Sequence, residues 1–421
     1  MHRVWRRLLG LCDRTVLEDV EFNEDAEVVV AHVRPKSRYQ RRCGRCGRRS
    51  PRHDNGHGRR RWRGLDLGTV KVFLEAEVPR VRCRRHGVTV VQVPWARHKA
   101  RQTRQLEDTV AWLATHCSKT AVTTLLRITW RTVGSVITRV VAEIDSQVDR
   151  LDGLARIGID EISYKRGHRY ITIVVDHDTG RLVWAGKGRD KATLQGFFDL
   201  LGEDRSAQIT HVSADAADWI ATVVAQRCPN AVRCADPFHV VAWATDALDQ
   251  VRRQAWNDAR GAVSQRTAPR AKGMARSLKH ARYALWKNPE NLTDNQREKL
   301  AWIAKTDPRL HRAYLLKEGL RLVFALKGQA GIEALDRWIS WARRCRIPAF
   351  VALQRRIVKH RDAIDAALIH GLSQGLIESC NTKIRVLTRV AFGFKSAEAL
   401  IALAMLALGG YRPDLPHQRA A

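Results

Sequence analysis

Three acidic residues lie where a charged side chain is unusual. Asp160 follows the apolar residues 157–159, Asp215 ends a second strand-like run, and Glu378 lies early in a late helical segment. A carboxylate that follows buried strand residues is rarely left without a partner. Carboxylate oxygens suit Mg²⁺, and three of them can hold two ions for phosphodiester cleavage. Asp160, Asp215 and Glu378 are therefore candidate catalytic residues that bind two Mg²⁺ or Mn²⁺ ions.

The segments that carry Asp160 and Asp215 have the pattern of a mixed α/β sheet. Five strands are expected from apolar runs and the turn residues between them, at 156–160, 169–175, 181–185, 208–215 and 231–235. Helices are expected at 191–201 and 216–227, and a third begins at Pro237. This order is typical of a ribonuclease H-like five-stranded sheet. Its parallel crossovers are right-handed, so Asp160 and Asp215 should face each other at one edge.

Other interpretations of these acids remain open. Asp215 could simply cap the helix that begins at residue 216. Asp218 competes with Asp215 as a candidate, although it lies a turn into that helix and should point away. Glu161 follows Asp160, so strand alternation directs it to the opposite face of the sheet.

The helix that carries Glu378 brings a carboxylate and basic groups onto one face. Counted from Glu378, four polar residues recur at helical spacing: Asn381, Thr382, Arg385 and Arg389. Glu378 is the only late acid with a suitable setting for a third metal ligand, but it could instead be a surface acid paired with Thr382 or Arg385. Arg385, Arg389 and Lys383 are candidate contacts for DNA phosphates.

Two Cys-x-x turns near the start of the chain have the spacing of a zinc ribbon. Four candidate ligands form two pairs separated by a β-hairpin: Cys43, Cys46, Cys83 and His86. Each pair can supply two corners of a tetrahedron, and the glycine after each of Cys43, Cys46 and His86 permits a tight turn. His53 and His57 in the intervening loop could compete as ligands, and the first pair alone could be a redox pair. The two pairs together favour structural Zn²⁺.

The next segment has a helical pattern that indicates a helix-turn-helix. Ser118 should cap a helix over 119–127, and after a short break a second helix runs from 130 to 141. Four exposed polar residues of the second helix could read a major groove: Arg131, Thr132, Ser135 and Arg139. Many such helix pairs are plain core packing, and the positive charge around this one favours DNA binding.

The whole chain is strongly basic. Its 421 residues include 74 Lys and Arg against 43 Asp and Glu, which gives a net charge of +31. The expected partner is a polyanion, with nucleic acid favoured over a membrane. No apolar run is long enough to cross a bilayer, no signal-peptide pattern is found, and nine scattered cysteines fit a reducing compartment. We therefore expect a cytoplasmic protein.

Composition divides the chain into six expected segments. Residues 251–364 carry helical patterns rich in Arg, Lys and Trp, with capping-box spacing at Thr293 and Gln296 and no strand pattern. The segments are a zinc-binding part at 1–96, a helix-turn-helix at 97–150, the first part of the α/β core at 151–250, an all-helical insertion at 251–364, the final core helices at 365–411, and a flexible tail at 412–421.

Five stretches are similar to the bacterial insertion-sequence transposases of the ISL-three family. They are CGRC…CRRHG, IGIDEISYKRGHRYITIVVD, HVSADAADWIATVVAQRCPNAVRCADPFHV, RYALWKNPENL and SQGLIESCNTKIRVLTRVAFGF, and together they span nearly the whole chain. The resemblance implies a DDE-type transposase. In this family a zinc-binding segment and a helix-turn-helix precede a ribonuclease H-like catalytic domain, which a helical insertion interrupts before its glutamate.

The resemblance also assigns roles to individual residues. The three catalytic carboxylates of the family match, in order, Asp160, Asp215 and Glu378. Asp236 and His239 match an Asp-x-x-His element that supports the active site. One departure concerns the second zinc pair, usually Cys-x-x-Cys, which is Cys83-x-x-His86 in this chain. Histidine is an acceptable zinc ligand, so the site should survive with a different charge.

The resemblance and the charge together lead to an expected function. The chain should bind the terminal inverted repeats of its own element through residues 1–150, cleave the DNA ends with Mg²⁺, and join the 3′-hydroxyl ends to target DNA. A homodimer or higher oligomer is expected because two ends must be cut together. The alternatives are a DNA-binding regulator that has lost catalysis and a host nuclease of the same fold. The expected location is the bacterial cytoplasm, in association with the nucleoid.

Overall fold

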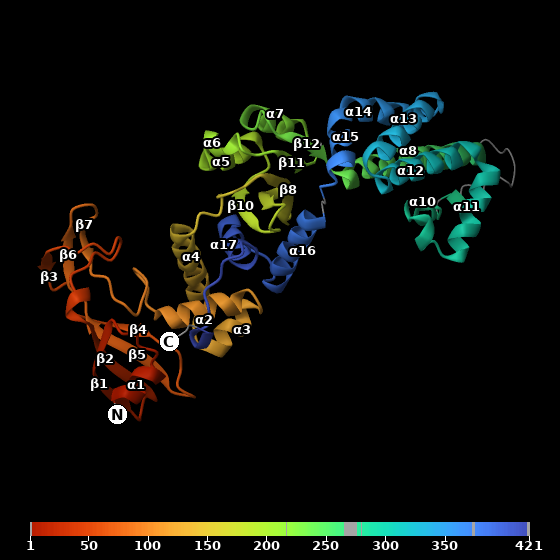
Figure 1. The fold of residues 1–421 in the computed structure, drawn as a ribbon. Helices are drawn as coiled ribbons and strands as arrows, with labels where there is room; N and C mark the ends of the chain where they lie inside the picture. The colour runs from red at the N-terminus through yellow and green to blue at the C-terminus, as the bar shows by residue number, and fades with distance from the viewer. Residues whose placement is uncertain (1, 216, 265–275, 279, 373–374, 419–421) are drawn as a thin grey trace.

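The computed structural model describes residues 2–215, 217–264, 276–278, 280–372 and 375–418. The chain is elongated, with a β-rich N-terminal part at one end, a sheet with covering helices in the centre, and a helical part at the other end (Figure 1). Ser373 and Gln374, which open the late motif, and residues 419–421 of the expected tail lie outside the described residues. Among the described residues, no helix combines the length and apolar character needed to cross a membrane.

Two small sheets form the N-terminal part, after helix α1 (His2–Leu8). Their strands are β1 Thr15–Asn23, β2 Val28–Pro35, β3 Arg52–Asp54, β4 Arg59–Arg63, β5 Lys71–Glu77, β6 Arg80–Cys83 and β7 Gly87–Val90. One sheet has the order β1-β2-β5-β4 and the other β3-β6-β7. In the core, the rings of Trp62 and Trp95 meet edge to face at 5.5 Å. The β4–β5 hairpin, expected within the zinc ribbon, belongs to the first sheet because β5 also pairs with β2.

Three helices follow: α2 Arg104–Ala114, α3 Lys119–Leu126 and α4 Trp130–Gln147. Ser118 caps α3 as predicted, with its Oγ accepting from the Ala121 N–H at 3.2 Å. Arg127 then takes a left-handed conformation (φ 51°) that ends α3, and the Thr129 side chain caps α4. α3 and α4 thus form the predicted helix-turn-helix. α4 runs beyond the predicted end at residue 141 because Ile144 continues its apolar stripe.

The central sheet has the predicted strand order. Its strands are β8 Arg156–Lys165, β9 Arg169–Asp176, β10 Leu182–Lys187, β11 His211–Ala214 and β12 Val232–Ala235. They lie in the order β10-β9-β8-β11-β12. β8, β11 and β12 are parallel neighbours, and β8, β9 and β10 form an antiparallel meander. This mixed five-stranded arrangement is consistent with a ribonuclease H-like domain and confirms the predicted α/β fold.

Helices cover both faces of this sheet. They are α5 Lys191–Leu201, the short α6 Glu203–Ser206, α7 Asp218–Arg227, α16 Gly375–Val390 and α17 Ala397–Leu408. Ile157 and Ile159 pack with α5 and α7 on one face, while Ile162 packs with α4, α16 and α17 on the other. Because side chains alternate along a strand, Gly158 and Asp160 belong to the α16 face.

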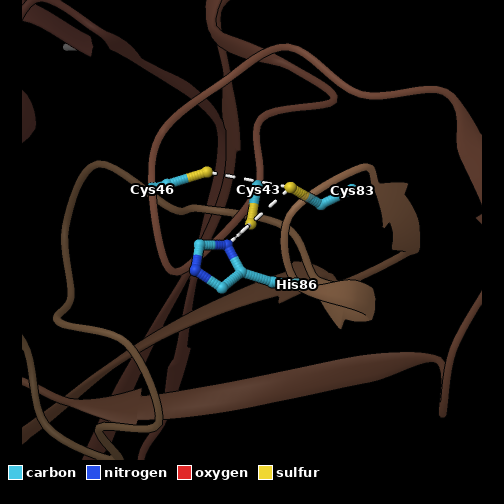
Figure 2. A group of neighbouring side chains, drawn as sticks. All are labelled: Cys43, Cys46, Cys83 and His86. Carbon is cyan, nitrogen blue, oxygen red and sulfur yellow. Dashed lines mark hydrogen bonds between the residues drawn. The ribbon is translucent and has the colours of Figure 1, made fainter.

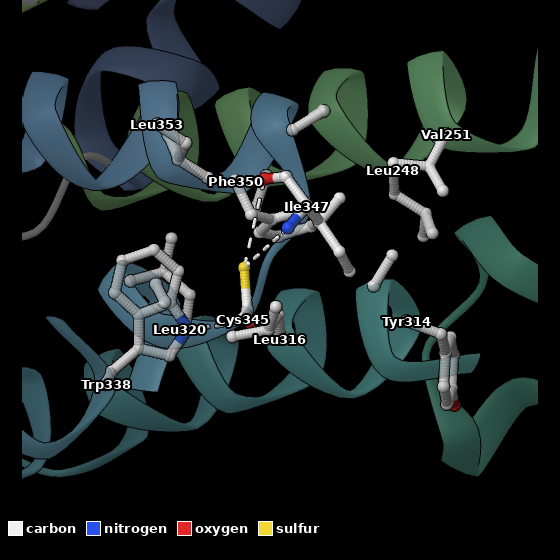
Figure 3. Close-up of a cluster of buried hydrophobic side chains, with 14 of the residues drawn as sticks. Leu248, Val251, Tyr314, Leu316, Leu320, Trp338, Cys345, Ile347, Phe350 and Leu353 are labelled. Carbon is white, nitrogen blue, oxygen red and sulfur yellow. Dashed lines mark hydrogen bonds between the residues drawn. The ribbon is translucent and has the colours of Figure 1, made fainter. Parts of the chain in front are cut away.

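The helical insertion has a hydrophobic core of its own. Its helices are α8 Pro237–Ser264, α10 Arg282–Trp286, α11 Asp294–Thr306, α12 Pro308–Ala325, α13 Gly328–Arg344, α14 Pro348–Lys359 and α15 Arg361–His370. Figure 3 shows Trp338, Phe350 and Leu353 packed with side chains of α8 and α12. The described part of 251–364 contains no strand, as predicted. The predicted capping box is present, since the Thr293 N–H donates to Gln296 Oε1 at 3.1 Å.

The insertion leaves and re-enters the central sheet at the same edge. α8 begins directly after β12, and the α15 side chains Ala366 and Ala367 pack against Cys234 of β12. The remaining short turns are 3₁₀ helices at Ser37–Tyr39, Pro289–Asn291 and Pro416–Gln418. The last of these is the only helical turn in the described part of the expected tail, 412–418.

Candidate active site and DNA-binding surfaces

Asp160 and Asp215 occupy matching positions where β8 and β11 diverge. The parallel pairing of the two strands ends at Ile159 and Ala214, so the next residue of each strand is one of these acids. The sequence predicted that the strand ends at Asp160. In the structure β8 continues to Lys165 in pairing with β9, so Asp160 lies inside the strand. The pairing with β9 keeps β8 extended after β11 has turned away. Within the described part of the chain, no strand therefore pairs with β8 beside Asp160 on the β11 side.

Asp160 accepts two hydrogen bonds. The Glu161 N–H donates to Oδ1 at 2.7 Å, and Asn381 Nδ2 donates to Oδ2 at 2.5 Å. Asn381 is only 4% exposed and lies on α16, so that helix reaches the carboxylate directly. Burial raises the pKa of Asp160, and the two donors oppose this shift because they stabilise the charged form. The sequence pattern places Asn381 on the Glu378 stripe but gave it no role.

α16 can approach β8 closely because a glycine lies beneath it. A Cβ on Gly158 would collide with Ile377 Cδ1 and would lie 3.0 Å from His177 Nε2. His177 Nε2 in turn lies 2.6 Å from Ser213 Oγ on β11. Gly158 therefore sets the spacing between α16 and the sheet, and with it the position of Asn381.

Asp236 and His239 stand beside the two strand acids, at the start of α8. His239 Nδ1 lies 2.7 Å from Asp236 Oδ2 and 3.8 Å from Asp215 Oδ1. The hydrogen bond to Asp236 raises the pKa of His239 to about 9; burial opposes this rise, and the charges of Asp215, Asp236 and Asp160 add to it. The imidazole is therefore positively charged at neutral pH and faces three carboxylates.

Glu378 is the one predicted carboxylate that stays exposed. It lies in the first turn of α16, three residues before Asn381 and hence on the same side of the helix. Within the described parts of the chain, the only group of three or more His, Cys, Asp or Glu side chains arranged to hold a metal ion is the cysteine–histidine group near the N-terminus. Glu378 thus lies one helical turn before Asn381, which binds Asp160. Its carboxylate does not form a metal-binding group with those of Asp160 and Asp215.

The side chains around Asp160 have the chemistry of a site for a hard divalent cation. Asp160 and Asp215 offer oxygen donors, which Mg²⁺ and Mn²⁺ prefer. Burial raises the pKa of Asp160, so its charged form needs a cation nearby. His239 supplies one positive charge against the carboxylates of Asp160, Asp215 and Asp236. The residues present therefore fit Mg²⁺ or Mn²⁺.

The competing acids point elsewhere. Asp218 lies at the start of α7, and Lys359 Nζ of α14 is 3.4 Å from its carboxylate. Glu161 lies on the opposite face from Asp160, where Arg189 Nε is 3.5 Å from Oε1, and burial raises its pKa. The N-cap position of α7 is residue 217, two residues after Asp215, so Asp215 does not occupy the cap.

Cys43, Cys46, Cys83 and His86 converge as predicted. Their ligand atoms all lie within 4.8 Å of one another (Figure 2). His86 Nδ1 is 3.7 Å from Cys43 Sγ and 3.8 Å from Cys83 Sγ, which is 3.8 Å from Cys46 Sγ. Bonds of about 2.3 Å to sulfur and about 2.1 Å to nitrogen in a tetrahedron imply edges of roughly 3.6–3.8 Å. Burial acts to raise the pKa of Cys83, but the backbone N–H groups of Arg85 and His86 help lower it to about 6. The group fits a structural Zn²⁺ ion.

Glycines shape both turns of this group. Gly47 and Gly87 have φ of 67° and 65°, a left-handed backbone conformation that residues with a side chain rarely adopt. Gly44 has no such conformation, but a Cβ there would lie 2.6 Å from a backbone carbonyl of β7. His53 and His57, the possible competitors, do not belong to the described four-residue group.

The four predicted groove-reading residues of α4 divide into two sets. Arg131 and Ser135 are exposed, and Thr132 is half-buried with its Oγ1 2.9 Å from Thr129 Oγ1. Arg139 differs, because its Nη2 and Nε lie 2.6 and 2.9 Å from Oε1 of Glu107, a fully buried side chain of α2.

This arrangement gives Arg139 a role within the fold, and its DNA contact stays a prediction. Glu107 Oε2 also accepts a hydrogen bond from Arg97 Nη1 at 3.2 Å. Arg97 Nη2 donates to Asp108 Oδ1 at 2.6 Å. A buried carboxylate such as Glu107 needs a paired cation, so the Arg139 guanidinium is committed to the α2–α4 contact. Sequence spacing places Arg139 on the helix but does not reveal that Glu107 is buried opposite it.

The basic residues of α16 remain on the surface. Lys383, Arg385 and Arg389 are all exposed, and none of the three has an ion-pair partner among the described residues. Arg385 and Arg389 are four residues apart and therefore share one side of the helix with Glu378. They lie on the helix that also contacts Asp160.

Three family models match the chain in the order of these parts. Residues 40–86 match the zinc-finger of transposase IS204/IS1001/IS1096/IS1165, and residues 91–141 match the helix-turn-helix domain of transposase family ISL3. Residues 157–404 match a model of the same family described as a transposase. The last match spans the central sheet, the insertion and the helices α16 and α17.

Named relatives of similar length give the same result. The chain is 66% identical over 430 residues to the transposase for insertion sequence element IS1557 in two strains of Mycobacterium tuberculosis, CDC 1551 and H37Rv, with 98% of this chain and 97% of the relative covered. It is 26% identical over 388 residues to the transposase for insertion sequence element IS1001 of Bordetella parapertussis, with coverages of 91% and 92%. The chain therefore belongs to the ISL3 family of transposases, enzymes that act on DNA.

Proposed function

We propose that this transposase binds the terminal inverted repeats of its insertion sequence, cleaves the DNA ends by metal-dependent phosphodiester hydrolysis, and joins the 3′-hydroxyl ends to target DNA. The observation that carries the proposal is the pair Asp160 and Asp215, which follow the last paired residues of two parallel strands. The matching family and the basic charge of +31 support DNA as the substrate.

The catalytic residues of the proposal are Asp160, Asp215 and Glu378. Together they would hold two Mg²⁺ or Mn²⁺ ions, which when bound supply an activated nucleophile and charge for the leaving oxygen. Asn381 fixes one oxygen of Asp160 before the substrate arrives. His239, whose Nδ1 is hydrogen-bonded to Asp236 Oδ2, lies 3.8 Å from Asp215 Oδ1 and offsets the clustered negative charge. Glu378, which is exposed and apart from Asp160 and Asp215 in the structure, would join them from the first turn of α16 when metal and DNA bind.

DNA binding is divided among separate surfaces in this proposal. Residues 1–150 recognise the terminal repeats, with α4 in a major groove and Arg131, Thr132 and Ser135 towards the bases. Lys383, Arg385 and Arg389 hold phosphates near the cleavage site, because exposed ammonium and guanidinium groups pair well with phosphate oxygens. The catalytic core comprises 151–250 and 365–411, with 251–364 as the insertion, so that the start of α8 and the end of α15 belong to the core. The enzyme acts as a homodimer or higher oligomer on DNA of the bacterial nucleoid, in the cytoplasm.

Cleavage of a supercoiled plasmid that carries the ends of the element tests the proposal. The wild-type protein should nick or cut at the ends only with Mg²⁺ or Mn²⁺, and Asp160→Asn should abolish cleavage while retaining binding to the terminal repeats. Binding without cleavage by the wild type would instead indicate a regulator that has lost catalysis. Cleavage of branched DNA without any dependence on the terminal sequence would indicate a host nuclease.

A further inference from the structure

A basic cavity lies between the central sheet and the helical insertion. It has a volume of about 580 Å³ and is lined by residues from the start of α7 and the end of α14: Ala217, Asp218, Arg355, Arg356, Lys359 and His360. The two sides are joined by the exposed ion pair of Lys359 with Asp218. The cavity is thus formed by two parts of the chain that lie far apart in sequence.

Positive charge dominates this cavity. Arg355, Arg356 and Lys359 are exposed, and Asp218 is the only acid in the lining. Arg233 lies behind them on β12, where burial lowers its pKa and the charges of Asp218 and Asp215 oppose that shift. Among the described residues, no hydrogen-bond acceptor is found for its buried Nε. In the lining itself, three exposed basic groups against one acid suit an anionic ligand.

The cavity lies close to the proposed catalytic residues. Arg233 Nη2 donates to the backbone carbonyl of Asp215 at 3.2 Å. On α8, His239 and Trp243 are four residues apart, so they lie on one side of the helix about 6 Å apart along its axis. His239 faces Asp215, whereas Trp243 lies against the cavity, with its ring centroid 5.8 Å from that of His360. One turn of α8 therefore separates the cavity from the active site.

One arginine of the cavity is already oriented. The Arg356 guanidinium carbon lies 3.6 Å from the centroid of the Trp243 ring, which is a close cation–π stack. Stacking restricts the guanidinium plane, so less conformational entropy is lost when it binds a phosphate. α14 itself is anchored by Phe350, Leu353 and Ile357, all buried in the core of the insertion.

We propose that this cavity binds a backbone phosphate of the DNA strand being cut, next to the phosphate that reacts at Asp160 and Asp215. The inference rests on the proposed function, because it takes the reacting strand to pass Asp215. A phosphate held here by Arg355, Arg356 and Lys359 positions the strand without reading its sequence. It also links the insertion to the active site, since bound DNA contacts both α7 and α14.

The test removes two exposed charges and measures DNA binding separately from cleavage. The double variant Arg355→Gln/Lys359→Gln is compared with Arg337→Gln/Arg343→Gln, which removes equal charge from two exposed residues of α13 in the same insertion. Both are prepared with and without Asp160→Asn. The probe is a duplex that carries one element end and flanking DNA on both sides of the cleavage position.

The expected result is a smaller salt dependence for the cavity variant. Loss of one neutralised phosphate lowers the slope of log K against log salt concentration by about 0.9, so the cavity variant should have a slope smaller by up to about 0.9. The control variant should keep the slope of its Asp160→Asn parent. In the background with intact Asp160, the cavity variant should cleave the same duplex more slowly at subsaturating protein and recover at high protein concentration.

The possible failures can be told apart. Equal slopes for the cavity variant, the control variant and the parent would overturn the phosphate site, whatever the cleavage activity. Equal reductions in the cavity and control variants would also overturn it, because they would show only a general effect of charge. If the protein with intact Asp160 cuts no DNA, the proposed activity fails, and a selective loss of slope in the cavity variant still supports the site as a DNA contact.

Discussion

Asp160 is the residue with the most closely defined surroundings in the candidate active site. Its two oxygens accept from different elements, Oδ1 from the β8 backbone and Oδ2 from Asn381 on α16. Burial disfavours its charge, and these two donors partly restore it. Under the proposed function, Asn381 is therefore a positioning residue, which would act on the reaction through the carboxylate that it orients.

Loss of the Asn381 amide should weaken metal use more than DNA binding. We expect Asn381→Ala to lower cleavage about 10–100-fold, the usual effect of removing a hydrogen-bond partner of a metal ligand. The concentration of Mg²⁺ or Mn²⁺ needed for half-maximal cleavage should rise, while affinity for the terminal repeats stays within twofold. Thr382→Ala, at the exposed neighbouring position, is the control and should behave as wild type. An unchanged metal requirement in Asn381→Ala would contradict the positioning role.

Arg139 and Arg131 should behave in opposite ways although they lie on the same helix. Arg139→Gln removes a charged hydrogen bond from fully buried Glu107 and should destabilise the fold by about 1.5–3 kcal/mol. Arg131→Gln removes an exposed charge, so stability should hold while the salt dependence of DNA binding falls. Denaturant unfolding and binding titrations at several salt concentrations measure the two effects. A loss of salt dependence without loss of stability in Arg139→Gln would support its DNA contact.

At the scale of elements, the contact between α16 and β8 determines whether Asn381 reaches Asp160. Ile377 fills the space over Gly158, and no other residue type leaves that space free. The geometry of the proposed active site thus depends on the absence of a side chain at Gly158.

A methyl group at Gly158 should displace α16. We expect Gly158→Ala to cost about 1–3 kcal/mol through overpacking and to reduce cleavage strongly, because Asn381 moves with the helix. The double variant Gly158→Ala/Ile377→Ala, which reopens the space, should recover part of the lost cleavage, although truncation of the buried Ile377 lowers stability in its own right. Gly196→Ala in α5, where an added Cβ meets nothing within 4 Å, is the control. Melting temperature and cleavage rate are the measurements, and failure of the double variant to recover cleavage would disprove the steric explanation.

The sequence predicted most of the elements because each has a strong local signal. Alternating apolar residues define β8 and β9, and Ser118 marks the start of α3. Relations between distant segments were harder to predict. The burial of Glu107 against Arg139, the approach of Asn381 to Asp160, and the exposure of Glu378 depend on how helices pack, which periodicity does not encode. Local propensity specifies elements, whereas side-chain partners arise from tertiary contacts.

At the scale of the whole molecule, the chain has several separate hydrophobic cores. One lies in the N-terminal part around Trp62, two lie on the faces of the central sheet, and one lies within the insertion around Phe350. Domains with separate cores generally do not unfold in a single cooperative step. The parts can therefore be perturbed one at a time.

Removal of zinc should affect the N-terminal part selectively. The wild-type chain should bind one Zn²⁺, and Cys83→Ser should lose it, with loss of binding free energy that is about 10–16 kcal/mol in small zinc domains. Calorimetry should show one transition moved to lower temperature while that of the insertion stays. Cys83→Ser should also weaken binding to the terminal repeats. Cys12→Ser, at an exposed cysteine outside the group, should change neither the zinc content nor this binding. Retained zinc in Cys83→Ser would exclude this ligand set.

The path of the chain at β12 has a bearing on how such enzymes diversify. α8 departs from the end of β12 and α15 returns to pack against it, so the polypeptide detours outward and comes back to nearly the same point. Residues can accordingly be gained or lost along the detour over evolutionary time without shifting the hydrogen-bonded register of β8 and β11. Related transposases are free to vary in mass and outline at this location while retaining the same reaction chemistry.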